Sequence, residues 1–189
     1  MFQIVVHGYT LSCFSGGLPE DYEVYREKAK LVDEIDLARD VSHSADVCFL
    51  AVQKELAWPF LVVAQKYAPS GLGGSYPQAL LIPETDMLFL GAGERVLTYR
   101  LVPLEKVGQE SAEQGFHAFE RHGQYVIMRA ELELAVWTIQ GKKQWSQFVE
   151  PPWSYRVEQE VMSVDVMGHV LSFPLSTGPG PIEKVWWLP

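Results

Sequence analysis

The chain has 189 residues, of which 48% are hydrophobic and 12% aromatic, a composition that supports a buried core and excludes a disordered or fibrous polymer. Fifteen Lys and Arg against 24 Asp and Glu give a formal net charge of -9, so no diffuse positive field is available to hold a nucleic acid. The apolar runs fall far short of the roughly 20 residues that cross a bilayer. We therefore expect one domain, residues 1–189, that binds neither nucleic acid nor a membrane.

The first residues predict a strand rather than a secretion signal, because residues 1–8 lack a basic leader and a long apolar segment. A cytoplasmic location is the corresponding expectation. Cys13 and Cys48 are too few for a disulfide framework and predict reduced thiols, with Cys48 as a small core residue. Residues 12–17 place Cys13 beside a glycine pair, and we expect a loop between the first strand and a helix there rather than a nucleophile.

One helix is predicted, from about Glu20 to Ala38. Pro19 and the early carboxylates suit a helix start, and apolar side chains recur at helical spacing. Residues 46–53 and 59–67 are short apolar segments that predict a buried hairpin. Residues 68–77 are rich in Gly and Pro and predict a loop. The N-terminal part of the domain, residues 1–70, thus contains strand, helix and hairpin.

A repeat follows in residues 78–178. Three segments align without gaps and begin 38 and 36 residues apart: Met87–Leu101, Tyr125–Ile139 and Val161–Leu175. This spacing is close to the length of one propeller blade. Tyr99, Trp137 and Phe173 share one column, with apolar residues two positions before and after. The intervening columns are also largely apolar, which predicts strands covered on both faces by neighbouring sheets. Residues 84–86, 121–124, 140–143 and 167–168 are expected to form the turns.

These stretches resemble blades of the quinoprotein-like and WD-like β-propellers, whose repeats often end in an apolar strand followed by Gly-Lys and a tryptophan, here Gly141 to Trp145. The resemblance implies a mainly β fold, an incomplete or distorted propeller-like array with one N-terminal helix. Only one copy has the full ending, no Trp-Asp pair occurs, and three copies are fewer than the about four to eight blades of a closed ring. The cofactor of quinoprotein enzymes is therefore not implied, and no cofactor is expected. A two-layer β-sandwich is the alternative fold.

Motifs for catalysis or metal binding are absent from the sequence, which has no HExxH, no CxxC and no Gly-x-Ser-x-Gly. His117 and His122 are five positions apart, so a regular strand would place them on opposite faces, and we expect no shared metal. Glu131 and Glu133 alternate with leucines, and we expect a solvated pair on one strand face rather than an acid–base pair. No catalytic, cofactor-binding or metal-binding residue is assigned.

Aromatic side chains are dense near the C-terminus, and large rigid rings mark protein interfaces. The candidate interaction surface comprises Trp145, Phe148, Trp153, Tyr155, Trp186 and Trp187. Packing of the indoles between blades, with the last pair fixing the tail of residues 179–189, accounts for the same pattern. The preferred hypothesis is a non-catalytic protein-binding module with an acidic, aromatic-rich surface that binds a basic partner by charge complementarity.

Two alternatives stand beside it. One is a small-molecule-binding protein or hydrolase-type enzyme that uses a cleft between the N-terminal segment and the repeats, with residues 71–75 as a lid and His7, Cys13, Glu131 and Glu133 as candidate groups. The other is a homo-oligomer in which the unfinished edges of two chains complete a larger ring.

Overall fold

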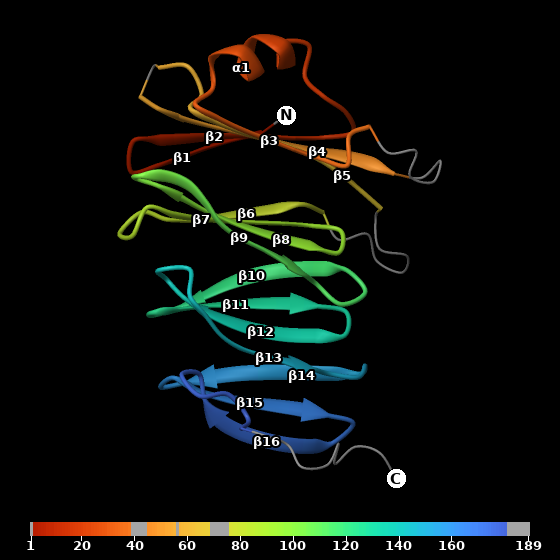
Figure 1. The fold of residues 1–189 in the computed structure, drawn as a ribbon. Helices are drawn as coiled ribbons and strands as arrows, with labels where there is room; N and C mark the ends of the chain where they lie inside the picture. The colour runs from red at the N-terminus through yellow and green to blue at the C-terminus, as the bar shows by residue number, and fades with distance from the viewer. Residues whose placement is uncertain (1, 39–44, 56, 69–75, 181–189) are drawn as a thin grey trace.

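The computed structural model describes residues 2–38, 45–55, 57–68 and 76–180. Four β-sheets lie one on another in chain order, as Figure 1 shows from the N-terminal sheet to the C-terminal one. The first sheet has the order β1 (Phe2–Val6), β2 (Tyr9–Ser15), β4 (Asp46–Lys54), β5 (Leu61–Tyr67) and β3 (Leu31–Ile35). The second contains β6 (Gln78–Ile82), β7 (Met87–Ala92), β8 (Arg95–Leu101) and β9 (Leu104–Ser111).

The third sheet contains β10 (Phe116–His122), β11 (Tyr125–Ala130), β12 (Glu133–Thr138) and β13 (Lys143–Phe148), and the fourth contains β14 (Trp153–Glu158), β15 (Val161–Val166) and β16 (His169–Pro174). Within the second, third and fourth sheets every strand pairs antiparallel with the next one in the chain. The first and last sheets lie at opposite ends of the array, so no ring closes (Figure 1). The incomplete propeller-like array is confirmed, and four layers exclude the two-layer sandwich.

The helix is shorter than predicted. Helix α1 spans Tyr22–Lys28, and Ala29 is already extended, with φ -70° and ψ 146°. The amides of Lys30 and Leu31 both donate to the Phe60 carbonyl, and residues 31–35 continue as β3, parallel to β5. Apolar residues four apart fit a helix face, but they also fit one face of a strand. The expected helix over residues 29–38 is therefore wrong. Among the described residues no helix is long and apolar enough to cross a membrane.

Residues 12–15 were expected in a loop, and the structure corrects this. They belong to β2, which pairs with β1 on one side and β4 on the other, so Cys13 lies in a central strand. Both cysteines are free, as predicted, and both are buried, as was predicted for Cys48. The predicted hairpin is confirmed by the antiparallel pairing of β4 with β5. Of the predicted loop, residues 69–75 lie outside the described part of the chain.

The three repeat copies are equivalent hairpins, each formed by the second and third strands of its sheet. In each copy the aromatic of the shared column points to the preceding sheet. Tyr99 lies in the core between the first and second sheets, Trp137 in the core between the second and third, and Phe173 in the core between the third and fourth. Trp137 packs edge-on against Phe89. The predicted repeat and its packing face are confirmed.

A backbone hydrogen bond recurs in every sheet and reveals a fourth copy that the sequence alignment missed. The amide at or directly after the end of the third strand donates to the carbonyl of the residue before the second strand: Leu101 to Asp86 at 2.8 Å, Ile139 to Gln124 at 2.9 Å and Leu175 to Glu160 at 2.8 Å. In the first sheet the amide of Glu55 donates to the Gly8 carbonyl at 3.0 Å. Residues 16–45, inserted between β2 and β4, hide this copy in the sequence.

The first sheet is covered on its outer face by α1. Tyr22 on the helix packs with Phe49 and Ala51 of β4 and with Val62 of β5. Gln53 holds the column position of Tyr99 and lies, by strand alternation, on this outer face. In the described part of the chain this face is covered by α1 and not by a sheet, which accounts for a polar residue where the later copies have a ring.

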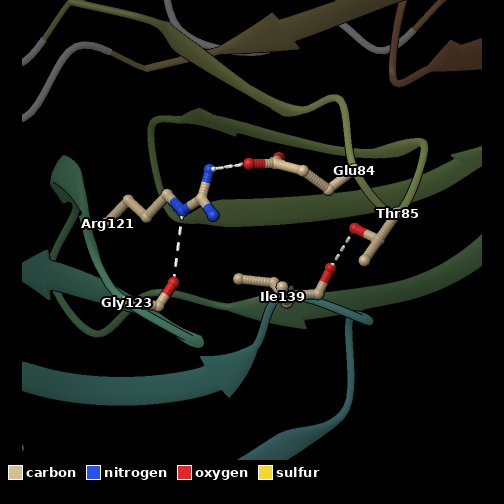
Figure 2. A network of polar contacts seen from close by, with 5 residues as sticks. All are labelled: Glu84, Thr85, Arg121, Gly123 and Ile139. Atoms are coloured by element: carbon tan, nitrogen blue, oxygen red, sulfur yellow. Dashed lines mark hydrogen bonds and ion pairs between the residues drawn. The ribbon is translucent and has the colours of Figure 1, made fainter.

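Polar contacts at a turn join the second sheet to the third (Figure 2). Arg121 on β10 donates to both carboxylate oxygens of Glu84, at 2.9 and 3.1 Å, and its Nε donates to the Gly123 carbonyl at 3.2 Å. The Thr85 hydroxyl donates to the Ile139 carbonyl at 2.5 Å. The turn predicted at residues 84–86 therefore also fixes the position of the next sheet.

Candidate functional site: a groove between the third and fourth sheets

A cavity of about 450 Å³ opens between the third and fourth sheets. Its walls come from β10 and β11, with the turn that follows β11, on one side and from β14, with the residues just before it, on the other. We call it the interblade groove. Its lining consists of His117, Glu120, His122, Arg129, Ala130, Glu131, Pro151, Pro152, Trp153, Ser154, Tyr155 and Val157.

Two aromatic side chains of β14 form one wall. Trp153 and Tyr155 stand two residues apart on the face directed at the third sheet, and their rings stack with centroids 6.3 Å apart and planes 24° apart. Both side chains are half-buried. The Trp153 Nε1 group donates to the Glu131 carbonyl at 3.2 Å, which anchors the indole across the groove.

The facing wall carries charge from β10, β11 and the turn after β11. Glu120 lies 3.5 Å from Arg129 Nε and 3.6 Å from His122 Nε2, and Glu131 lies 3.0 Å from His117 Nε2. All of these side chains are between about a third and a half exposed, at 34% to 48%. With neutral imidazoles, the two carboxylates and one guanidinium give the groove one net negative charge.

Two polar groups in the groove are shielded from solvent without a hydrogen bond of normal geometry, the Tyr155 hydroxyl and Arg129 Nε. Burial raises the pKa of the Tyr155 phenol, and the neighbouring Glu120 raises it further. The phenol therefore stays neutral and keeps its proton as a donor. Buried donors without acceptors cost free energy, so this part of the groove is incompletely satisfied.

A β-bulge directs both histidines into the groove, contrary to the prediction of opposite faces. The pairing of β10 with β11 shifts register between Phe116 and Ala118, so His117 has no partner on β11. The extra residue reverses the alternation, and His117 and His122 line the same groove. Among the described residues, no three His, Cys, Asp or Glu side chains group so as to hold a metal ion.

Comparison with the preceding layer shows why the groove is open. Phe116 and Phe119 fill the boundary between the second and third sheets and are 0% and 4% exposed. Trp153 holds the place of Phe116 one sheet later, because Phe116 pairs with Ala130 and Trp153 with Val166, 36 residues on. At equivalent positions, aromatic side chains fill the boundary between the second and third sheets, whereas a cavity lies between the third and fourth.

The residue beneath the rings differs between the two layers. Phe116 lies directly on Gly91 of β7, where an added Cβ would come within 2.4 Å of the ring. The equivalent residue on β11, 38 positions later, is Arg129. The third sheet therefore carries a long side chain where the second sheet carries none.

Of the six aromatic residues predicted as one surface, the four that the structure describes do not form one patch. Trp145 packs edge-on against Phe173 at 5.4 Å, and its Nε1 donates to the Leu175 carbonyl at 2.7 Å, so it belongs to the core between the third and fourth sheets. Phe148 is 47% exposed on β13, at the edge of the third sheet opposite to β10. Trp186 and Trp187 lie outside the described residues. Only Trp153 and Tyr155 line the groove.

The groups named for a catalytic alternative are not brought together. Glu131 precedes β12, whereas Glu133 is 7% exposed, accepts from the Glu113 amide at 3.2 Å and lies 3.9 Å from Lys143 Nζ. The prediction of one strand face for this pair is wrong, because the strand begins only at Glu133. Cys13 belongs to the apolar cluster that fills the boundary between the first and second sheets, where the catalytic cleft was expected.

The bulge in β10 and the position of β14 opposite β11 in the next sheet create the site, and neither has a clear signal in the sequence. The Gly91–Arg129 difference was present in the aligned repeat, but its meaning depends on the ring that packs above each residue.

No protein-family model and no curated protein sequence matches the chain. Among solved structures, Hsv2 of Kluyveromyces lactis matches with a TM-score of 0.31 and 10% identity, over 55% of this chain and 35% of that chain. KlHsv2 with loop 6CD replaced by a Gly-Ser linker matches with a TM-score of 0.31 and 11% identity, over 56% and 37%. Hsv2 of Kluyveromyces marxianus matches with a TM-score of 0.35 and 6% identity, over 68% and 46%. The matched part spans less than half of each Hsv2 chain.

Proposed function

We propose that the protein is a non-catalytic protein-binding module whose interblade groove holds a basic, extended segment of a partner protein. The observation that carries the proposal is the stacked pair of Trp153 and Tyr155, facing the carboxylates of Glu120 and Glu131 across a cavity of about 450 Å³. The rings and the acids come from different sheets, so the fold itself creates their proximity.

The chemistry of the groove suits a cationic side chain. The faces of Trp and Tyr attract ammonium and guanidinium groups, and a carboxylate forms strong charge-assisted hydrogen bonds with them. Arginine fits best, because its planar guanidinium stacks on a ring while donating at its edge. The net charge of -9 would steer a basic partner towards the module.

A binding role without covalent chemistry is supported by where the nucleophiles lie. The thiols of Cys13 and Cys48 are in the core between the first and second sheets, two layers away from the groove. Burial raises the pKa of the Cys13 thiol to about 11, so it is protonated at neutral pH. The groove offers instead rings and paired charges, which suit recognition.

The test measures binding of labelled peptides by fluorescence anisotropy at low salt. The probes are a nonapeptide of alternating arginine and glycine and its counterpart with glutamate in place of arginine. We expect saturable binding of the arginine peptide, and Trp153→Ala should weaken it about tenfold through loss of the stacking ring. Glu131→Gln should also weaken binding of the arginine peptide. The Glu131 side chain is 48% exposed, so this substitution should leave the protein folded.

The matched control is Trp58→Ala, which removes a 52% exposed indole next to α1, at the other end of the array. Its affinity for the arginine peptide should equal that of the unaltered protein. Equal binding of both peptides, or equal losses in Trp58→Ala and Trp153→Ala, would contradict a specific role of the groove. Thermal unfolding of each variant separates loss of binding from loss of fold.

A further inference from the structure

We infer that Arg129 is an internal occupant of the interblade groove, which holds the groove open and stands in the place of the partner's cation until a partner binds. The inference rests on the proposed function for its second half only. Its first half, that Arg129 keeps the groove open, concerns the packing of the protein alone.

The role in packing follows from the two equivalent layers. In the boundary between the second and third sheets, the ring of Phe116 occupies the space above Gly91 and is fully buried. In the boundary between the third and fourth sheets, Arg129 takes the position of Gly91, and Trp153 remains half-buried. The side chain of Arg129 thus occupies the volume that the ring of β14 would need in order to pack on β11.

The role as a stand-in follows from the contacts of the guanidinium. Arg129 Nε lies 3.5 Å from Glu120 Oε1, and it is shielded from water without a hydrogen bond of normal geometry. The Tyr155 hydroxyl in the same groove also has no hydrogen bond of normal geometry, although Glu120 lies near enough to raise its pKa. A cation held by one long ion pair is bound weakly, because charge-assisted hydrogen bonds need shorter contacts. Glu120 can therefore exchange Arg129 for a better placed guanidinium.

The consequence is competition between an internal and an external cation. An arginine of the partner would have to share the groove with a like charge, which lowers affinity and excludes weakly basic ligands. Binding would move Arg129 out of the groove into solvent, which its 42% exposed side chain can reach. Arg129 would then lower the affinity for every cationic ligand, so that only strongly basic segments bind.

The first variant is Arg129→Met, which keeps most of the length of the side chain and removes its charge. We expect the groove to stay open and the arginine–glycine nonapeptide to bind about five- to tenfold more tightly, because one like charge is gone from a partly screened site. Arg156→Met is the control, since Arg156 is 73% exposed on the outer face of the fourth sheet and carries the same charge. If Arg156→Met gains the same affinity, the effect comes from net charge alone, which would overturn the stand-in role. Weaker binding by Arg129→Met would overturn it too.

The second variant is Arg129→Gly, which copies the residue of the preceding sheet. We expect Trp153 to move onto β11, with a blue-shifted tryptophan emission and reduced quenching by acrylamide, and with loss of peptide binding. The same spectra in a Trp153→Phe background assign the change to this indole. An unchanged exposure of Trp153 would overturn the packing role.

The two proposals fail in different ways. If neither the unaltered protein nor Arg129→Met binds the peptide, then the proposed function and the stand-in role are both wrong. The fluorescence spectra of Arg129→Gly still decide whether Arg129 holds the groove open. If the unaltered protein binds and Arg129→Met binds no better, then only the stand-in role is wrong. Circular dichroism of each variant verifies that the sheets are retained.

Discussion

The hydroxyl of Tyr99 donates a hydrogen bond of 2.6 Å to Oδ2 of Asp33, which joins the second sheet to the inserted strand β3 of the first. Lys106 Nζ lies 2.7 Å from the same carboxylate oxygen. The ring of Tyr99 is fully buried in the core between these sheets. A buried phenol, a carboxylate and an ammonium group thus link the inserted segment to the repeat.

Tyr99→Phe should lower the free energy of unfolding by about 1–2 kcal/mol, because it removes a hydrogen bond to a charged group but keeps the ring. Asp33 retains Lys106, so the loss should remain in this range. Urea denaturation followed by circular dichroism measures it. Tyr67→Phe is the control, since its hydroxyl donates to Asp46 at the longer distance of 3.3 Å. A loss in Tyr67→Phe as large as in Tyr99→Phe would contradict the special role of Asp33.

Gly91→Ala should destabilise the protein by about 1–3 kcal/mol through overpacking, because the added methyl group would meet the buried ring of Phe116 at 2.4 Å. Gly108→Ala is the matched control on β9, where the added Cβ would meet only Thr98 Oγ1, at 3.0 Å. Thermal unfolding of both variants tests the difference. If the two variants unfold alike, then the ring of Phe116 does not depend on the space above Gly91.

Alkaline pH should destabilise the protein through its two buried thiols. Burial raises the pKa of Cys13 to about 11 and that of Cys48 to about 12, from an ordinary value near 9. The folded protein therefore holds these protons where the unfolded chain has released them. The stabilising contribution is complete below about pH 9 and is lost as pH rises towards 11 and 12.

Between pH 8 and pH 10 the two thiols should lower the free energy of unfolding by about 2–3 kcal/mol, as each contributes in proportion to the difference in bound protons. Tyr9, whose pKa is raised to about 12 by burial and by Asp86, adds to the fall near pH 10, where the phenol of the unfolded chain begins to release its proton, and so do the other tyrosines whose pKa values burial raises. Urea denaturation at several pH values measures the slope. The free energy of unfolding of the double variant Cys13→Ala, Cys48→Ala should fall by about 2–3 kcal/mol less over this range, and a slope equal to that of the parent would refute the assignment.

The repeat could be found from the sequence because each copy keeps a ring at the same position of its third strand, where it must fill the boundary with the preceding sheet. The copy in the first sheet escaped for a physical reason. Its column position is Gln53, on the outer face where α1 packs rather than a sheet, and residues 16–45 separate its two strands. A pattern of buried rings detects only sheets that have a sheet before them.

The end of the helix and the interblade groove could not be predicted from the sequence, for two other reasons. Leu31 and Ile35 are four apart, a spacing shared by helix and strand, and only pairing with β5 decides between them. The groove depends on one extra residue in β10 and on which side chain of β11 lies under the rings of β14. Both depend on contacts between strands that local periodicity does not encode.

Trp145 and Trp153, predicted as parts of one surface, should respond differently to substitution. Trp145→Phe removes the 2.7 Å hydrogen bond to the Leu175 carbonyl and part of the packing on Gly178, where an added Cβ would lie 2.6 Å from the indole. We expect a loss of about 1–2 kcal/mol in the free energy of unfolding. The affinity for the arginine–glycine nonapeptide should stay unchanged, because Trp145 is not among the lining residues of the groove.

Trp153→Phe should give the opposite pattern. The indole of Trp153 is half-buried and donates its hydrogen bond at the longer distance of 3.2 Å. Its replacement should therefore lower the free energy of unfolding by at most about 1 kcal/mol. Peptide affinity should fall several-fold, since Phe attracts a cation less strongly than Trp does. Denaturation and anisotropy on the same samples give both quantities. Of the two tryptophans, only Trp153 lines the interblade groove. If Trp145→Phe weakens binding while Trp153→Phe leaves it intact, the peptide is therefore not recognised in this groove.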